Sequence, residues 1–142
     1  QGVAVDYAEA IRWYKKGIHG GDVDAMCNMG LMLREGEGVE QNHDEAQRLF
    51  RMAAERGHRH ASYLIGTAHD QGLGVPIDYQ EAMMWYRRAA AQGHRDAIFA
   101  IGALYMNGEG VERDVEKALT YLRQAASMGS GPAQRLINAT LQ

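Results

Sequence analysis

The chain has 142 residues, a formal net charge of −3, 46% hydrophobic residues and 23% charged residues. This composition indicates a single globular domain and excludes a disordered chain. The sequence has no dense Lys/Arg run of the kind that nucleic-acid-binding proteins carry, which argues against a nucleic-acid partner. No apolar run approaches the roughly 18 residues of a membrane-spanning helix, which argues against direct membrane insertion. The single cysteine excludes an internal disulfide. Cytoplasm and periplasm both remain open as compartments.

A segment of fifteen residues is repeated along the chain at a period of 36 residues. "GEGVEQNHDEAQRLF", starting at Gly36, returns as "GLGVPIDYQEAMMWY" at Gly72 and as "GEGVERDVEKALTYL" at Gly108, and a shorter version opens the chain. Such self-similarity is the mark of a repeat architecture. It predicts one repeat domain over 1–142, composed of a partial repeat at 1–24, full repeats at 25–60, 61–96 and 97–132, and a capping helix at 133–142.

The first helix of each repeat is predicted from a stripe of apolar residues. Ala25, Met29 and Leu33 recur at i, i+4 and i+8 between residues 25 and 35, and the later repeats carry residues at the same phases. Gly36 follows this stripe, and glycine can adopt the left-handed conformation that ends a helix. The sequence therefore predicts helices that end at Gly36 and at its in-phase equivalents, Gly72 and Gly108.

The second helix of each repeat is predicted to begin after a capping Asp or Asn, whose side-chain oxygen can accept a free backbone N–H. The four capping residues are Asp6, Asn42, Asp78 and Asp114. A glutamate follows three residues after the first three of them, which resembles a capping box. Lys117 occupies that position in the last repeat. In the repeat at 25–60, this second helix is predicted to bury Ala46 and to end at Gly57.

Glycines in the middle of the first helices predict close helix contacts. Gly30, Gly66 and Gly102 each carry a cost of about 1 kcal/mol relative to alanine in a helix interior. Because this loss of helix stability recurs at the same position of each repeat, we expect a compensating contact there. The expected contact is the close approach of the second helix of the repeat, whose Ala46, Ala82 or Ala118 would face the glycine. Bulky pairs in the second helices, Trp13 and Trp85 among them, are predicted to be core residues that fill the space between repeats.

This pattern resembles the Sel-one-like repeat family, which is related to the tetratricopeptide repeats. The resemblance rests on the alanine stripe, the Gly-x-Gly-Val turn, the Asx cap and the paired bulky residues, and it covers the whole chain. It implies an all-α, right-handed α-solenoid of antiparallel helix pairs with first helices on the concave side. It also implies that the protein is a non-catalytic bacterial adaptor, which brings other proteins together in signalling, in the cell envelope or in secretion. One cysteine-rich branch has been linked to β-lactam binding, but this chain has only Cys27.

The two ends of the chain are predicted to differ. Pro132 and Ala133 open a last helix in which Ile137 and Leu141 continue the stripe and Asn138 replaces the mid-helix glycine, as in a capping repeat. No corresponding cap opens the chain. The chain is therefore expected to be the C-terminal part of a longer array, and an uncovered end could allow end-to-end self-association. A natural end produced by processing is the alternative.

The sequence predicts no catalytic residue, cofactor or metal. His58 and His60 form an H-x-H pair, which falls short of the three or four ligands that zinc requires. Histidines in the turns, His94 included, are expected to be surface residues. His69 and Asp70 could form an oriented base, but no recognisable nucleophile accompanies them, and His69 occupies a stripe position that favours packing.

A partner surface is predicted on the concave side, from first-helix positions outside the packed stripe. It is mixed, with aromatic and apolar residues beside acids, and favours a protein or peptide with basic and aromatic residues. The alternative for Tyr63 and Phe99 is packing between repeats. The alternative function is a small-ligand (cell-wall fragment) binder or weak hydrolase that uses the same groove. The predicted partner-binding residues are Asp24, Leu31, Arg34, His60, Tyr63, Thr67, Asp70, Asp96, Phe99 and Met106.

Overall fold

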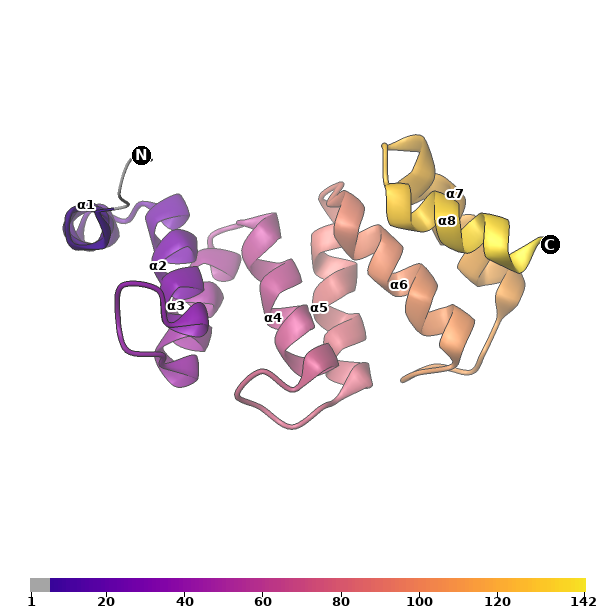
Figure 1. Cartoon of the computed structure of the whole chain (residues 1–142), viewed down its shortest axis with the longest axis horizontal. Helices are drawn as coiled ribbons and strands as arrows, with labels where there is room; N and C mark the ends of the chain where they lie inside the picture. Colours follow the sequence, from indigo (N-terminus) through magenta and orange to yellow (C-terminus); the bar gives the residue numbers. More distant parts are fainter. Residues whose placement is uncertain (1–5) are drawn as a thin grey trace, which may run out of the picture. The chain divides into compact units, whose positions relative to one another are not determined.

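A computed structural model of the chain describes residues 6–142, and these form eight α-helices and no strand (Figure 1). The first five residues of the predicted partial repeat lie outside the described residues. The all-α prediction is confirmed. The helices are α1 Tyr7–His19, α2 Val23–Glu35, α3 His43–Glu55, α4 Arg59–Gln71, α5 Tyr79–Ala91, α6 Arg95–Asn107, α7 Val115–Ser127 and α8 Gly131–Thr140.

The predicted helix boundaries are confirmed by their capping contacts. Each capping Asp or Asn of α1, α3, α5 and α7 accepts the backbone N–H three residues later, at 3.0 to 3.1 Å. Gly36 and Gly108 close α2 and α6 in the left-handed conformation, with φ of 72° and 68°. A side chain there would be strained, because residues other than glycine rarely adopt a positive φ.

The predicted capping boxes of α3 and α5 do not form, because the backbone donor they need is already used. The N–H of Asn42 donates to the carbonyl oxygen of Leu33, at the end of the preceding helix. Glu81 instead accepts the indole N–H of Trp85 at 3.2 Å. We call the backbone hydrogen bond from each of these capping residues to the carbonyl oxygen nine residues earlier the turn clamp. It joins Asn42 to Leu33 (2.8 Å), Asp78 to His69 (2.8 Å) and Asp114 to Tyr105 (3.0 Å).

Histidines cap two of the first helices, a role that was not predicted. The Nδ1 atoms of His58 and His94 accept the backbone N–H groups of Ala61 and Ala97, each at 3.1 Å. His94 is 9% exposed, so the prediction of a surface histidine is wrong for this residue. A signal was present, because two common N-cap residues, Asp and Ser, hold the same phase at positions 22 and 130.

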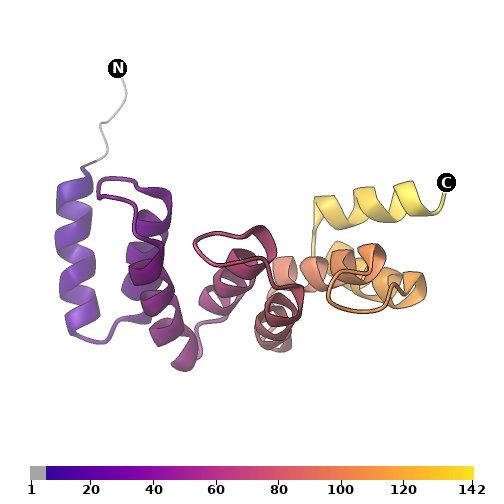
Figure 2. The same ribbon diagram turned by 90° about the horizontal axis from the view of Figure 1, so that it is seen from below.

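The chain forms two compact units, and the first comprises the residues up to Ala61. In this unit α2 packs against both α1 and α3. A Cβ placed on Gly30 of α2 would lie 2.6 Å from the ring of Phe50 in α3. The start of α1 lies beside the α2–α3 turn, where a Cβ on Gly38 would meet Tyr7 (Figure 2). The helices therefore approach as closely as the glycines predict.

Trp13 of α1 is 59% exposed, so its assignment to the core is wrong. Its indole N–H points to Glu9 at 3.4 Å, and the Lys16 ammonium lies 5.3 Å from its ring. Leu49 holds the same phase in α3 and is 2% exposed. The difference arises because α1 and α2 precede α3 in the unit, whereas no described helix precedes α1.

The second unit runs from Ser62 to Gln142 and contains most of α4 together with α5 to α8. One continuous core links its helices. A Cβ on Gly66 would lie 2.6 Å from the Tyr86 ring and 3.3 Å from the carbonyl oxygen of Ala82. The close approach is confirmed. Tyr86, the second residue of its bulky pair, packs on the glycine of its own repeat, so the prediction that it fills the space between repeats is wrong.

The last helix packs on α7 through part of the predicted stripe. Ile137 is buried, at 7% exposure, whereas Leu141 is 60% exposed because it forms the C-cap of α8. The repeated helix pairs of both units identify the chain as an α-solenoid with a 36-residue repeat. No helix among the described residues is long and apolar enough to cross a membrane.

Candidate functional site

The ten predicted partner-binding residues are divided between the two units. Asp24, Leu31, Arg34 and His60 belong to the first unit, and the other six belong to the second. Asp24 is exposed and accepts the Nε2–H of His58 at 2.9 Å. Because the Nδ1 atom of His58 accepts the cap bond, both ring nitrogens are engaged, and His58 has no free lone pair for a metal.

In the second unit, some predicted residues contribute far more surface than others. Tyr63 and Phe99 are half-buried against the core. Tyr63 also stacks on the ring of His94, with centroids 4.6 Å apart. Thr67 and Met106 are 6% and 9% exposed, so they offer little area to a partner. The candidate surface of this unit is therefore centred on Tyr63, Phe99 and the acids beside them.

Asp70 is held in a partly desolvated position at the end of α4. Its carboxylate accepts the hydroxyl of Tyr86 at 2.7 Å. Burial raises the pKa of Asp70 above its ordinary value, the Tyr86 hydrogen bond opposes this shift, and the charge of Glu109 adds to it. No ion pair joins either carboxylate to a cation within residues 6–142. The two acids thus form a local excess of negative charge, here called the Asp70–Glu109 pair.

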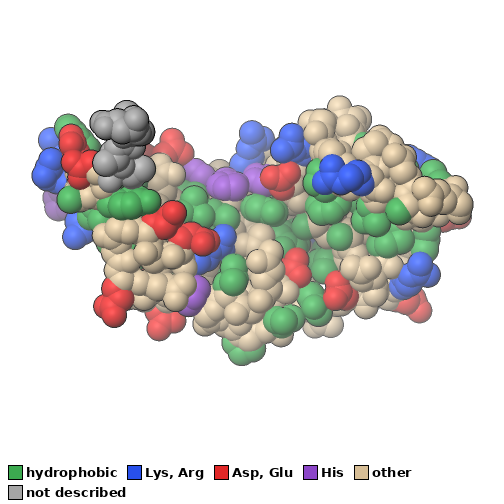
Figure 3. Space-filling model, in the orientation of Figure 1, with side chains coloured by type: hydrophobic (Ala, Val, Ile, Leu, Met, Phe, Trp, Pro, Cys, Tyr) green, Lys and Arg blue, Asp and Glu red, His purple; other side chains and the backbone are tan. Residues whose placement is uncertain are grey.

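Glu109 is fixed by groups that carry no charge. Asn107 donates its side-chain amide to Glu109 at 3.3 Å. A hydrogen bond to Glu109 raises the pKa of the Tyr79 hydroxyl. On the face of the second unit visible in Figure 3, acidic, basic and apolar side chains are interspersed.

Among the described residues, neither the His69–Asp70 combination nor the Cys27 thiol is arranged for acid–base or nucleophilic chemistry. His69 and Asp70 are not paired, because both ring nitrogens of His69 are buried without a hydrogen-bond partner and Asp70 accepts from Tyr86. Burial raises the pKa of the Cys27 thiol to about 11, and the side chain is 1% exposed. A buried thiol that retains its proton is a poor nucleophile.

Replacing Asp70 by Asn is expected to raise the stability of the protein at neutral pH. A raised pKa means that the native state binds the Asp70 proton more tightly than the unfolded chain does. The charged carboxylate therefore costs stability above this pKa. That cost disappears as the pH falls from the raised pKa toward the ordinary value of 3.8. Thermal unfolding across this pH range measures the difference between the variant and the wild type.

The exposed Asp44 supplies the matched control for this prediction. Asp44→Asn removes the same charge from the first turn of α3, where an acid is weakly stabilising, and should lower the melting temperature at neutral pH slightly rather than raise it. A lower melting temperature for Asp70→Asn than for the wild type at neutral pH would contradict the prediction. So would an advantage of the variant that stays constant from neutral pH to below pH 3.8.

These features define a helical-repeat protein of the α-solenoid class. The chain belongs to the Sel1 repeat family, whose family model matches residues 1–22, 23–58, 59–94 and 95–130. The resemblance predicted from the sequence is confirmed, and each matched full repeat begins two residues earlier than predicted, at the N-terminal residue of α2, α4 or α6. Sel1 repeats commonly mediate protein–protein interactions and are typically non-enzymatic.

Several solved structures share this fold. A Sel1 repeat protein from Oxalobacter formigenes is 40% identical with a TM-score of 0.86, and the match covers 91% of this chain and 53% of that one. A protective antigen of uropathogenic Escherichia coli is 31% identical with a TM-score of 0.86, covering 90% and 27%. Cysteine-rich protein B of Helicobacter pylori is 21% identical with a TM-score of 0.69, covering 96% and 99%, and shows the fold alone. The chain thus spans about half of the Oxalobacter protein and about a quarter of the Escherichia coli antigen. No curated protein matches it.

Proposed function

We propose that the chain is a non-catalytic bacterial adaptor that binds a protein or peptide through the first-helix face of its second unit. The partner segment carries a lysine or arginine next to an aromatic residue. Sel1 repeats commonly bind other proteins, which supports the general role. The Oxalobacter and Escherichia coli structures described above come from bacteria, which supports the bacterial part of the proposal. The role proposed for the adaptor is in bacterial signalling, the envelope or secretion.

The observation that carries this proposal is the Asp70–Glu109 pair. Its two carboxylates are held close enough for the charge of Glu109 to raise the pKa of Asp70, and they have no ion-pair partner among the described residues. A charge that costs stability is often kept for function. A partner's lysine or arginine would neutralise this charge and regain part of that cost on binding.

Tyr63 and Phe99 would supply the apolar part of the contact. Both are half-buried, so each already has its position fixed by packing and still offers part of its ring. Aromatic side chains contribute more binding energy than most residues, and a rigid ring loses little conformational entropy on binding. An aromatic residue of the partner beside its basic residue would fit this combination.

Selection from a random-peptide library on the immobilised wild-type chain tests the proposal. We expect peptides with Lys or Arg next to an aromatic residue to be enriched. Asp70→Asn should weaken the best peptide about tenfold, because one charge pair is lost. A Tyr63→Ala/Phe99→Ala variant should also weaken binding. Asp44→Asn is the control and should bind like the wild type. No basic enrichment, or equal affinity for Asp70→Asn, would show that the site is misplaced.

A further inference from the structure

A separate pocket of about 650 Å³ lies in the second unit, lined mainly by the second helix α7. None of the ten residues predicted from the sequence lines it. Tyr105 of α6 contributes to its wall, and the charged side chains around it come from α5, α7 and the turn before α7. The lining residues are Arg87, Tyr105, Asp114, Glu116, Lys117, Thr120 and Tyr121.

Tyr105 organises this pocket. Its ring stacks on Tyr121, with centroids 5.8 Å apart and planes inclined by 7°. Arg87 donates to the Tyr105 hydroxyl at 2.7 Å, and the Lys117 ammonium lies 5.3 Å from the Tyr105 ring centroid. Two cations are therefore held against one aromatic group, and within residues 6–142 no ion pair joins either of them to a carboxylate.

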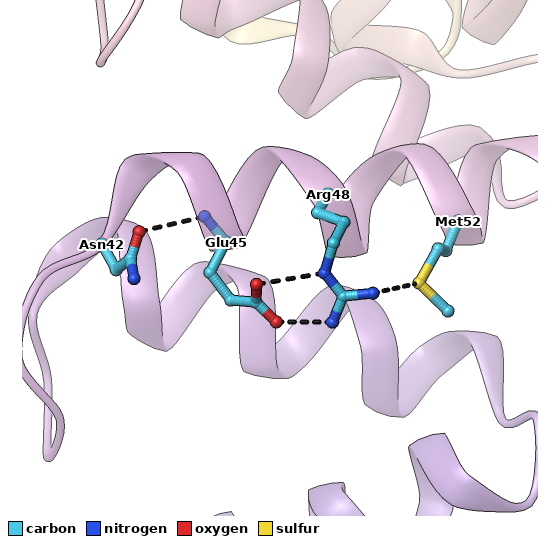
Figure 4. Close-up of polar contacts among 4 residues, drawn as sticks. All are labelled: Asn42, Glu45, Arg48 and Met52. Carbon is cyan, nitrogen blue, oxygen red and sulfur yellow. Dashed lines mark hydrogen bonds and ion pairs between the residues drawn. The ribbon is translucent and has the colours of Figure 1, made fainter.

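The first unit contains the equivalent pocket, of about 400 Å³, at the same repeat phase. There Leu33 and Leu49 stand at the positions of the two stacked tyrosines. Glu45 stands at the position of Lys117, and Arg48 at that of Thr120. Figure 4 shows Glu45 and Arg48 joined by two hydrogen bonds, one of them 3.0 Å long. The arginine in this pocket is thus neutralised by a carboxylate of the same helix.

We propose that the pocket of the second unit binds an acidic peptide segment, with a carboxylate held by Arg87 and Lys117 and an aromatic side chain packed against Tyr121. The carboxylate that the first unit provides internally would here come from the partner. An arginine fork and an ammonium group are the usual partners of a carboxylate. The aromatic wall suits a flat apolar side chain.

The two acids of the pocket have different roles. Asp114 caps α7 by accepting the backbone N–H of Lys117 at 3.0 Å, so its carboxylate keeps its charge but has a structural role and is left unchanged in the test. Glu116 is exposed, and within residues 6–142 no ion pair joins its carboxylate to a cation. It would repel an incoming carboxylate. Removing the charge of Glu116 should therefore tighten binding of an acidic peptide, whereas it would weaken binding of a basic one.

This pocket is distinct from the proposed first-helix site. The Asp70–Glu109 pair selects a basic segment, and the Tyr105 pocket selects an acidic one. Variants in one site should therefore leave binding at the other unchanged, and failure of either proposal leaves the other testable.

Binding of a fluorescent synthetic peptide, in which two glutamates flank one tyrosine, tests the inference by fluorescence anisotropy on the whole chain. The same peptide with glutamines in place of glutamates should bind about tenfold more weakly or worse, and added salt should weaken the acidic peptide. The Lys117→Glu/Thr120→Arg variant moves the ion pair of the first unit into this pocket. It should lower the affinity about tenfold, whereas Glu116→Gln should raise it.

Arg123→Glu supplies the control, because it reverses an exposed charge of α7 outside the pocket. It should change the affinity by no more than about twofold, since an exposed charge that does not line the pocket is screened by solvent. Circular dichroism of every variant verifies the fold. The inference is overturned if the acidic peptide does not bind, if the glutamine peptide binds equally well, if Lys117→Glu/Thr120→Arg has no effect, or if Glu116→Gln weakens binding.

Discussion

Phe50→Ala should lower the free energy of unfolding by about 4 kcal/mol. The Phe50 side chain is fully buried, and its ring packs directly on Gly30 of the neighbouring helix. Truncation removes a large apolar group and leaves a cavity that the backbone of α2 can fill only in part. Urea denaturation followed by circular dichroism measures the loss. Trp13→Ala is the matched control, and with Trp13 59% exposed its cost should be about 1 kcal/mol or less.

Phe50→Ala should also reverse the effect of Gly30→Ala on stability. In the wild type, Gly30→Ala would place a Cβ 2.6 Å from the Phe50 ring and should be destabilising. In the Phe50→Ala background that ring is absent, so alanine should stabilise the helix by up to about 1 kcal/mol relative to glycine. A double-mutant cycle measures this coupling. If Gly30→Ala costs the same in both backgrounds, contact with the ring is not the reason for glycine at this position.

Gly66→Ala should cost about 2 kcal/mol, because the added methyl group overpacks a rigid contact. The Tyr86 ring, 2.6 Å from the new Cβ, is buried and tied to Asp70 through its hydroxyl. Gly102→Ala should cost less. Its Cβ would lie 2.9 and 3.0 Å from two side-chain carbons of Leu122, contacts that are longer than those with the Tyr86 ring and that an aliphatic side chain can relieve by a change of rotamer. The backbone contacts are alike, with a carbonyl oxygen 3.2 Å from this Cβ and 3.3 Å from that of Gly66, so the side chains decide the difference. Urea denaturation of both variants checks this order.

Gly131→Ala is the control for this series. It lies in the first turn of α8, where the nearest atom to a new Cβ is the flexible end of Arg135, at 3.3 Å. Alanine there should be neutral or slightly stabilising. Equal costs for Gly66→Ala and Gly131→Ala would show that general helix effects, rather than the tyrosine contact, determine the outcome.

The fold could be predicted from the sequence because a 36-residue period repeats each local signal. One Asp or Asn before an apolar stretch is weak evidence, but the same residue class at Asp6, Asn42, Asp78 and Asp114 marks four helix starts. The failures have physical causes. The capping boxes were predicted from side chains alone. In the structure, the backbone N–H that the glutamate would need donates instead to a carbonyl oxygen of the preceding helix. Trp13 was assigned by phase, but burial also depends on the helices around it.

The candidate site was less predictable than the fold. Helical phase placed Tyr63 and Thr67 on the same first helix, but it could not show that Thr67 is buried and Tyr63 half-exposed. The link between Asp70 and Glu109 joins two repeats through their packing. The Tyr105 pocket requires three helices and a turn to meet, so no spacing within one helix indicates it. Comparison of in-phase residues, such as Glu45 and Lys117, would have suggested that the repeats differ there.

The turn clamp has a consequence for how such a chain can be altered. Its hydrogen bond joins main-chain atoms nine positions apart, so the direction of each second helix depends on the number of residues in the turn rather than on their side chains. Side chains at one equivalent position of the turns differ: Gln41 and Arg113 each donate to the backbone carbonyl oxygen seven residues earlier, at 2.9 and 2.8 Å. Ile77 at the same position has no such donor, and the turn clamp forms in all three turns. Cutting and rejoining repeats within this turn, with its length preserved, would retain the geometry that lets one module follow another. The surfaces on either side could then be exchanged as separate parts.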